Sequence, residues 1–284
     1  MPQEDHTQPR PMTEAPTEQS TLATRLLSAF LMGPIAIGAA YFGGAWFAAL
    51  IAFSFVLMCF EWSRMVEGKE FGRGYYVLTI AGVLALAFAA LGKFPYAYSV
   101  AAIGGVAALF LRSEKRLAGR WVALGSLYLL MPCIALLWLR NNNFAGRELL
   151  FMLFAIVWAT DSGAFLIGRY FGGPKLSPAL SPAKTWSGAI GGVAAGGLAS
   201  LVASEMILGQ GEAVFYWLVG ACLGLMSILG DLVESAFKRV FGVKDISGFI
   251  PGHGGVLDRL DGMIFACVAM TATLYAHILY NSLQ

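Results

Sequence analysis

Charged residues are scarce in this sequence. Asp, Glu, Lys and Arg make up only 13% of its 284 residues, whereas 58% are hydrophobic and the mean hydropathy is +0.69. So few polar side chains cannot cover the surface of a soluble domain of this size. The composition therefore excludes a soluble globular protein and predicts an integral membrane protein.

Cysteine is also rare. The chain has four cysteines, each inside an apolar run, and none belongs to a CxxC pair. Cysteines in such surroundings behave as small hydrophobic side chains. Their spacing excludes a disulfide framework and a cysteine-based metal site.

Large apolar residues are almost absent from residues 1–22, which are polar and contain prolines. We expect this segment to form a disordered cytoplasmic tail. It lacks the basic-then-apolar order of a cleaved signal peptide, so the apolar run that follows is expected to be retained.

Long apolar runs, by contrast, fill the rest of the chain. A helix needs about 20 residues to cross the hydrocarbon core, and a helix satisfies its own backbone polar groups in lipid. We therefore predict an all-α polytopic membrane protein with nine transmembrane helices, or eight if residues 24–60 form one broken hairpin. The nine runs cover residues 24–43, 45–60, 75–91, 95–111, 121–139, 148–171, 186–208, 213–237 and 262–280.

The placement of basic residues predicts the orientation. With nine spans, only Lys93, Arg140 and Arg147 of the 19 Lys and Arg residues fall on the side opposite the N-terminus, which leaves 16 on the N-terminal side. The positive-inside rule then places the N-terminus in the cytoplasm and the C-terminus outside. We expect a multi-pass protein of the bacterial plasma (inner) membrane, with N-terminal membrane helices over 23–145 and a catalytic membrane domain over 146–284.

Charge is concentrated between Gly230 and Gly262, on the predicted cytoplasmic side. Asp231 and Glu234 share a helix face at i,i+3, and Asp258 and Asp261 repeat this spacing after the glycine-rich sequence PGHGG. Carboxylates from two separate elements suit Mg²⁺, and the interleaved Lys and Arg offer charge to a polyphosphate. The alternative is a solvated, ion-paired loop.

Two further patches interrupt the apolar pattern. Asp161 lies inside a predicted span, where a carboxylate suggests a functional site; the alternative is a helix contact with Asp161 paired to Arg169. Residues 174–188 contain prolines that deny them a regular helix, and lysines and hydroxyls precede the start of the next helix. Such a segment can hold an anion, or it can meet lipid phosphates at the membrane surface.

Several motifs resemble the signature of the phosphatidate cytidylyltransferase family, also called CDP-diacylglycerol synthases. The matching segments are Ser235, Lys238-Arg239, Lys244-Asp245, Pro251-Gly252-His253-Gly254-Gly255 and Asp258-Arg259-Leu260-Asp261. The loop at 174–188 is also similar, but Ala183 replaces the first lysine of the family's pair and Ser187 replaces its glutamate. The departure leaves Lys184 as the one matching lysine. The recognisable motifs span roughly residues 155–262.

The resemblance implies a membrane enzyme that converts CTP and phosphatidic acid into CDP-diacylglycerol and pyrophosphate with Mg²⁺; K⁺ as a second, monovalent ion is left open. Asp231 and Asp258 are predicted to be the metal-binding pair, with Asp261 and Asp161 in support, and no local cation is expected to pair with either of the first two. The catalytic candidates are Lys184, Lys238, Arg239, Lys244, His253 and Arg259. The substrate-binding candidates are Lys175, Ser177, Ser181, Thr185, Ser235, Gly254 and Gly255.

Three other classes are weighed against this hypothesis. A CTP-dependent polyprenol kinase would release CDP. A CDP-alcohol phosphotransferase would show DGxxAR spacing, which this sequence lacks. A transporter would place charges near mid-membrane on repeated broken helices, and no internal repeat is found. The released product separates these classes. Membrane lipids are expected partners, nucleic acid is not, and homodimerisation is left open.

Overall fold

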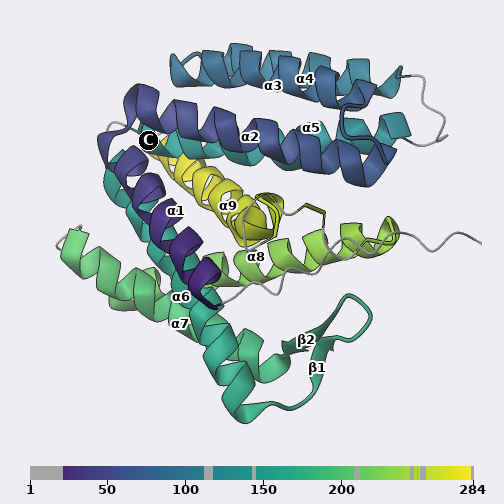
Figure 1. Ribbon diagram of the computed structural model, residues 1–284. Coiled ribbons are helices and arrows are strands. Elements are labelled where there is room, and N and C mark those ends of the chain that lie inside the picture. The colour runs from purple at the N-terminus through teal and green to yellow at the C-terminus, as the bar shows by residue number, and fades with distance from the viewer. Residues whose placement is uncertain are drawn as a thin grey trace, which may run out of the picture.

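The computed structural model describes residues 22–111, 118–142, 145–207, 212–243, 246–247, 249 and 254–282 (Figure 1). Within these ranges the chain forms nine helices and one two-stranded hairpin. In chain order they are α1 (Leu22–Phe42), α2 (Gly44–Glu67), α3 (Arg73–Ala90), α4 (Phe94–Leu109), α5 (Ala118–Arg140), α6 (Gly146–Phe171), β1 (Lys175–Ser177), β2 (Ser181–Thr185), α7 (Trp186–Ile207), α8 (Ala213–Val240) and α9 (Leu257–Ser282).

The predicted all-α membrane class is confirmed, because each predicted apolar run coincides with a helix. Seven of the described helices are long and apolar enough to cross a membrane. The described apolar part of α1, Met32–Phe42, and helix α4 are shorter than that. The count of nine spans therefore stays a prediction. The predicted tail lies outside the described residues except for Leu22.

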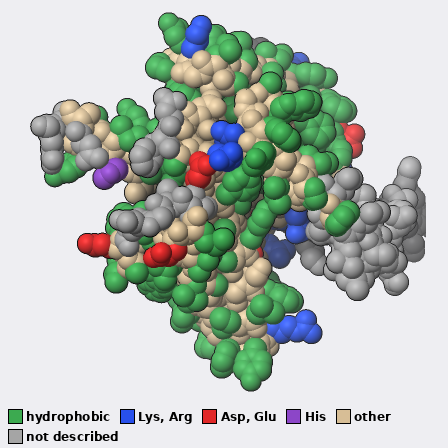
Figure 2. All heavy atoms as spheres, turned by 90° about the vertical axis from the view of Figure 1, so that its left-hand side faces the viewer, with side chains coloured by type: hydrophobic (Ala, Val, Ile, Leu, Met, Phe, Trp, Pro, Cys, Tyr) green, Lys and Arg blue, Asp and Glu red, His purple; other side chains and the backbone are tan. Residues whose placement is uncertain are grey.

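Many of the described helices expose apolar side chains outward as well as burying others, as expected of helices in lipid. Figure 2 shows one face of the molecule, on which hydrophobic side chains predominate and charged ones are few. Phe42, Trp46 and Phe110 are examples of large exposed apolar residues. Inside, α5 supplies fully buried side chains such as Leu129 and Ile134.

The helices form two groups that meet at α9. Helices α2, α3, α4 and α5 pack on one another at one end of the molecule, and α6, α7 and α8 form the other group (Figure 1). Helix α9 packs against both α5 and α8. The second group packs closely because small residues line its contacts. A Cβ at Gly192 of α7, for example, would lie only 2.8 Å from the Thr160 carbonyl oxygen of α6.

Contacts between helix ends define two opposite sides of the molecule. At one side, Arg140 at the end of α5 donates hydrogen bonds to the carbonyl oxygens of Ala40 (2.7 Å) and Tyr41 (3.0 Å) near the end of α1. At the opposite side, the end of α2 contacts the start of α9, and the β1–β2 hairpin contacts the end of α8. The second side carries the charged segments of the sequence.

The proline-containing segment after α6 is not helical, as predicted, but it is more regular than a loop. Strands β1 and β2 pair antiparallel, with Lys175 opposite Thr185 and Ser177 opposite Ser181. The hairpin projects from the helical body beside α6 and α7 (Figure 1). It brings Lys184 from a distant part of the sequence to the charged end of α8.

Candidate active site

A cavity of about 1180 Å³ lies where the hairpin meets the ends of α6 and α8 and the starts of α7 and α9. Its walls are of two kinds. Apolar side chains such as Ala164, Phe165 and Ile228 provide one kind, and ten charged side chains provide the other. The charged lining residues are Asp161, Arg169, Lys175, Lys184, Asp231, Glu234, Lys238, Asp258, Arg259 and Asp261.

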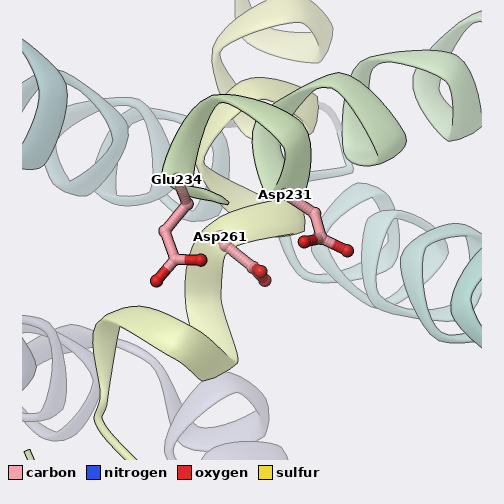
Figure 3. Close-up of side chains that lie close together, drawn as sticks. All are labelled: Asp231, Glu234 and Asp261. Carbon is pink, nitrogen blue, oxygen red and sulfur yellow. The ribbon is translucent and has the colours of Figure 1, made fainter. Parts of the chain in front are cut away.

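Two helices bring three carboxylates together in this cavity. Asp231 and Glu234 lie one turn apart on α8, and Asp261 lies in the second turn of α9 (Figure 3). One carboxylate oxygen from each residue lies within 4.8 Å of those of the other two. Side chains three residues apart share a helix face, so the i,i+3 spacing in the sequence accounts for the two acids of α8. The crossing of α9 over α8 supplies the third.

Lys184 of strand β2 forms an ion pair with Asp231. Its side chain is half-buried in the cavity, and it is the lysine that the loop retains where the family signature has two. The pair joins the hairpin to α8. A second contact supports this junction, because Arg239 Nε donates to the Leu180 carbonyl oxygen at 3.3 Å.

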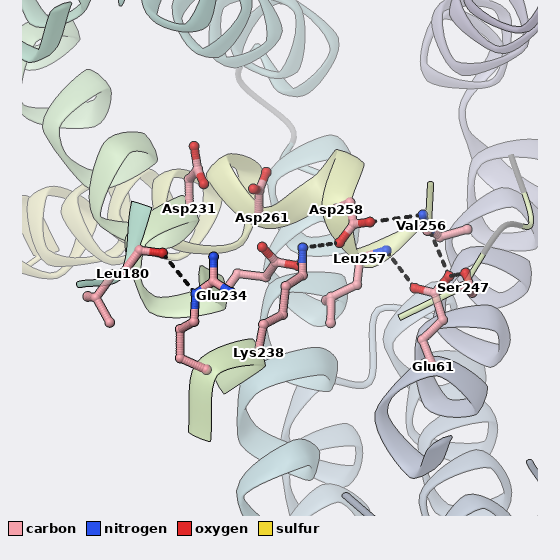
Figure 4. Close-up of polar contacts among 12 residues, drawn as sticks. Glu61, Leu180, Asp231, Glu234, Lys238, Ser247, Val256, Leu257, Asp258 and Asp261 are labelled. Atoms are coloured by element: carbon pink, nitrogen blue, oxygen red, sulfur yellow. Dashed lines mark hydrogen bonds and ion pairs between the residues drawn. The ribbon is translucent and has the colours of Figure 1, made fainter. Parts of the chain in front are cut away.

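Lys238 connects the acids of α8 and α9. Its Nζ lies 2.8 Å from Glu234 Oε1 and 2.6 Å from Asp258 Oδ1 (Figure 4). The Glu234 side chain is only 3% exposed and that of Asp258 is 11% exposed. Buried carboxylates are stable only when they are paired or hydrogen-bonded. Lys238 therefore compensates two acids that would otherwise repel each other.

No local cation is predicted to pair with Asp231 or Asp258, but the expectation that they are therefore unpaired is wrong. Lys184 pairs with the first through the hairpin, and Lys238 pairs with the second across the α8–α9 contact. Neither contact could be predicted from the sequence, because each joins side chains from separate elements. The structure also groups Asp231 with Glu234 and Asp261, whereas Asp258 is engaged by Lys238. The metal-binding role of each acid stays a prediction.

The two glycines before α9 are required by the side chains around them. Gly254 has φ +82°, and a Cβ there would lie 2.7 Å from Asp258 Oδ2. At Gly255 a Cβ would lie 2.6 Å from Glu61 Oε1 of α2, and the Gly255 N–H donates to Asp258 Oδ2 at 3.0 Å. The first position favours glycine by its backbone conformation, and the second by space. Gly254 lines the cavity, and Gly255 is buried behind it.

The start of α7 also faces the cavity. Thr185 precedes the helix, and its Oγ1 accepts a hydrogen bond from the Gly188 N–H at 3.1 Å, which is the geometry of an N-cap. Ser187, which replaces the family's glutamate, donates through its hydroxyl to the Gly172 carbonyl oxygen. Ser187 therefore joins the start of α7 to the end of α6.

The remaining predicted residues divide into three groups. Asp161, Lys175, Ser235 and Arg259 line the cavity together with the residues described above. Ser177, Ser181 and Arg239 are not among its lining residues. Lys244 and His253 lie outside the described residues.

Three acidic or basic residues near the site are not among the predicted site residues. Glu234 is the third member of the carboxylate group, and its i,i+3 spacing from Asp231 was a visible signal. Arg169 lines the cavity from the end of α6; it entered the sequence interpretation only as a partner for Asp161. The guanidinium of Arg169 lies 5.9 Å from the centre of the Phe165 ring.

Glu61 contacts the start of α9 from the distant helix α2, and nothing in its local sequence indicates this.

The charges of the cavity lining balance. Five acids and five bases line it, so the formal charge of the lining is zero. Such a site places cationic and anionic side chains next to one another. It can bind a polyphosphate through its bases and a hard cation through its acids.

Comparisons with known proteins point to cytidylyltransferases over most of the chain. The sequence model described as "Cytidylyltransferase family" matches residues 23–277. The chain is 35% identical over 262 residues to the phosphatidate cytidylyltransferase of Brucella suis, covering 88% of this chain and 92% of that protein. It is 37% identical over 265 residues to that of Pseudomonas aeruginosa, covering 90% and 97%. With the enzyme of Haemophilus influenzae it shares 42% identity over 130 residues, 44% of this chain and 45% of that protein.

Proposed function

The chain belongs to the Cytidylyltransferase family, and from this membership we propose how it converts CTP and phosphatidic acid into CDP-diacylglycerol and pyrophosphate. An oxygen of the lipid phosphate attacks the α-phosphorus of CTP, and the bond from that phosphorus to the departing pyrophosphate breaks. Negative charge grows on the bridging and departing oxygens. Catalysis then consists of positioning and electrostatic stabilisation rather than covalent chemistry by the protein.

Asp231, Glu234 and Asp261 are the residues we propose to hold Mg²⁺. They supply hard oxygen donors within 4.8 Å of one another, which suits this ion. The balanced lining charge supports the same assignment, because a triphosphate adds several negative charges to a lining whose five bases are already offset by five acids. A bound Mg²⁺ would neutralise phosphate oxygens and orient them for displacement.

The bases of the cavity are proposed to bind the phosphates. Lys184 is held at the cavity by its pair with Asp231, so its ammonium is placed where a phosphate oxygen can take over as partner. Lys175, Arg169 and Arg259 surround the same space from the hairpin, α6 and α9. Lys238 is occupied by Glu234 and Asp258, so its proposed role is to fix the acids rather than to bind substrate.

The two kinds of cavity wall suit the two substrates. The charged wall takes the nucleotide, and the apolar residues of α6 and α8 face the region where a lipid would enter. Phe165 supports this division, because it lines the cavity and is also strongly exposed on the apolar outside of α6. The basic residues gathered on this side of the molecule favour a cytoplasmic site in a bacterial plasma membrane.

Product identification tests this proposal. Purified protein incubated with phosphatidic acid, Mg²⁺ and CTP labelled at the α-phosphate should form labelled CDP-diacylglycerol and release pyrophosphate. Chelation of the divalent cation should abolish turnover, and Mg²⁺ should restore it. Release of labelled CDP with a phosphorylated lipid would instead indicate a lipid kinase, and full activity in the chelator would exclude the metal role.

Replacement of Lys184 by alanine should lower kcat by about 10- to 100-fold, the loss expected from one charge-assisted phosphate contact. The neighbouring residue is Ala183, so no adjacent lysine can substitute. Lys93→Met, which removes an exposed lysine at the opposite side of the molecule, is the control. If Lys184→Ala retains kcat within about twofold of wild type, the hairpin lysine does not contact the reacting phosphates.

A further inference from the structure

Glu61 is a buried carboxylate on α2, far in sequence from the cavity. It is 0% exposed, and it does not line the cavity. A carboxylate that is removed from water is stable only when hydrogen bonds or a cation compensate it. The structure shows what compensates this one: among the described residues, its hydrogen-bond donors lie in the segment that leads into α9 and at the first residue of that helix (Figure 4).

Both carboxylate oxygens of Glu61 are used. Oε1 accepts hydrogen bonds from the Ser247 hydroxyl and from the Val256 N–H, the latter at 2.9 Å, and Oε2 accepts from the Leu257 N–H at 2.8 Å. Helix α9 begins at Leu257. The first N–H groups of a helix have no partner within the helix, and its N-terminus carries a partial positive charge. Glu61 therefore caps α9 from another helix.

The first turns of α9 carry two of the site's acids. Asp258 follows directly after the two capped positions, and Asp261 lies one turn later, within the carboxylate group. Asp258 in turn accepts from the Gly255 N–H and pairs with Lys238. A continuous set of contacts thus runs from Glu61 through the start of α9 to the acids of α8. Gly255 permits it, because any Cβ there would collide with the Glu61 carboxylate.

We propose that Glu61 is a positioning residue of the reaction: by capping α9 it fixes where Asp258 and Asp261 lie relative to Asp231. This inference rests on the proposed role of the α8 and α9 acids. Displacement of a reacting group by about 1 Å can cost about 10²-fold in rate. An N-terminal helix that touches no substrate would then determine the geometry of the metal-binding carboxylates.

The chain provides a matched control on the same helix. Glu67, six residues further along α2, accepts hydrogen bonds from the Ser63 hydroxyl (2.8 Å) and from the Gly74 N–H (3.1 Å) near the start of α3. It is also a glutamate of α2 that compensates a helix N-terminus. Helix α3, however, contributes no residue to the cavity. Glu61→Gln and Glu67→Gln therefore remove the same charge from two glutamates of α2, each of which accepts a hydrogen bond from the start of another helix. Only the helix that Glu61 contacts carries residues of the cavity.

Each variant is assayed for kcat and KM, and hydrogen–deuterium exchange is measured on peptides that cover residues 246–262. Glu61→Gln should lower kcat about 10²-fold with little change in KM for phosphatidic acid, and amides at the start of α9 should exchange faster. Glu67→Gln should keep kcat within about threefold and leave those amides unchanged. Ser247→Ala, which removes one hydrogen bond and keeps the carboxylate, should lower kcat by about two- to tenfold.

Equal loss of kcat in both glutamate variants, or unchanged exchange at the start of α9 in Glu61→Gln, would overturn the proposal. If Glu61→Gln does not yield folded protein, Ser247→Ala decides alone: wild-type kcat and exchange in that variant would count against the proposal. Asp261→Asn, assayed in parallel, separates this inference from the metal assignment. Activity retained in Asp261→Asn would exclude the metal role of the α9 acid, whereas its loss together with normal Glu61→Gln would exclude only the positioning role.

Discussion

Asp231→Asn and Asp261→Asn should each abolish turnover, with a loss of at least about 10³-fold in kcat, which corresponds to roughly 4 kcal/mol of transition-state stabilisation. Each replacement keeps the size of the side chain and removes one negatively charged oxygen donor from the carboxylate group. Asp231→Asn also frees Lys184 from its ion pair. The double variant should be no slower than either single one, because ligands of one ion act as a unit.

The control for these variants is Glu205→Gln, which removes an exposed acid near the end of α7 remote from the cavity. It should leave kcat within about twofold of wild type. Expression and thermal unfolding of all variants should be compared in the same detergent. Substantial turnover by either Asn variant at saturating Mg²⁺, with normal expression, would contradict the assignment of that acid.

The helical framework follows from hydropathy alone. Each described helix coincides with an apolar run of the sequence, because a spanning segment must be apolar over its whole length and must satisfy its own backbone. The number of spans does not follow in the same way. Helix α4 is 16 residues long, which is just below the length of about 17–25 residues that crosses the hydrocarbon core.

The elements of the site could be predicted, but their pairing could not. The i,i+3 spacings placed Asp231 with Glu234 and Asp258 with Asp261, since this depends on helix geometry only. Which acid of α9 meets the acids of α8 depends on the crossing of the two helices. Lys238 forms an ion pair with Asp258, and Asp261 lies in the carboxylate group instead.

Contacts between residues far apart in the sequence were the hardest to predict. Glu61 caps a helix that begins almost 200 residues later, and no motif in the surrounding sequence of α2 indicates this contact. Lys184 reaches Asp231 only because residues 175–185 form a hairpin that folds back over α8. Both cases need the tertiary arrangement, which periodicity and charge spacing in one sequence do not contain.

Lys238→Met should be the most destabilising of these replacements. Methionine keeps the length of the apolar stem but removes the ammonium that lies between Glu234 and Asp258, and the lysine side chain is only 15% exposed. Removal of one partner from a buried ion pair leaves an uncompensated charge and typically costs about 3–5 kcal/mol. The free energy of unfolding should fall by about 3 kcal/mol, and turnover should be lost because the acids of α8 and α9 separate.

The cause can be separated from a general loss of packing by adding a second replacement. Asp258→Asn in the Lys238→Met background removes one of the two repelling charges, so part of the lost thermal stability should return while turnover stays absent. Lys93→Met should leave both stability and turnover unchanged, because that lysine is exposed in the α3–α4 connection. A Lys238→Met protein that unfolds at the wild-type temperature would show that the ammonium does not compensate the two carboxylates. If the double variant is instead less stable than Lys238→Met, repulsion between Glu234 and Asp258 is not the source of the instability.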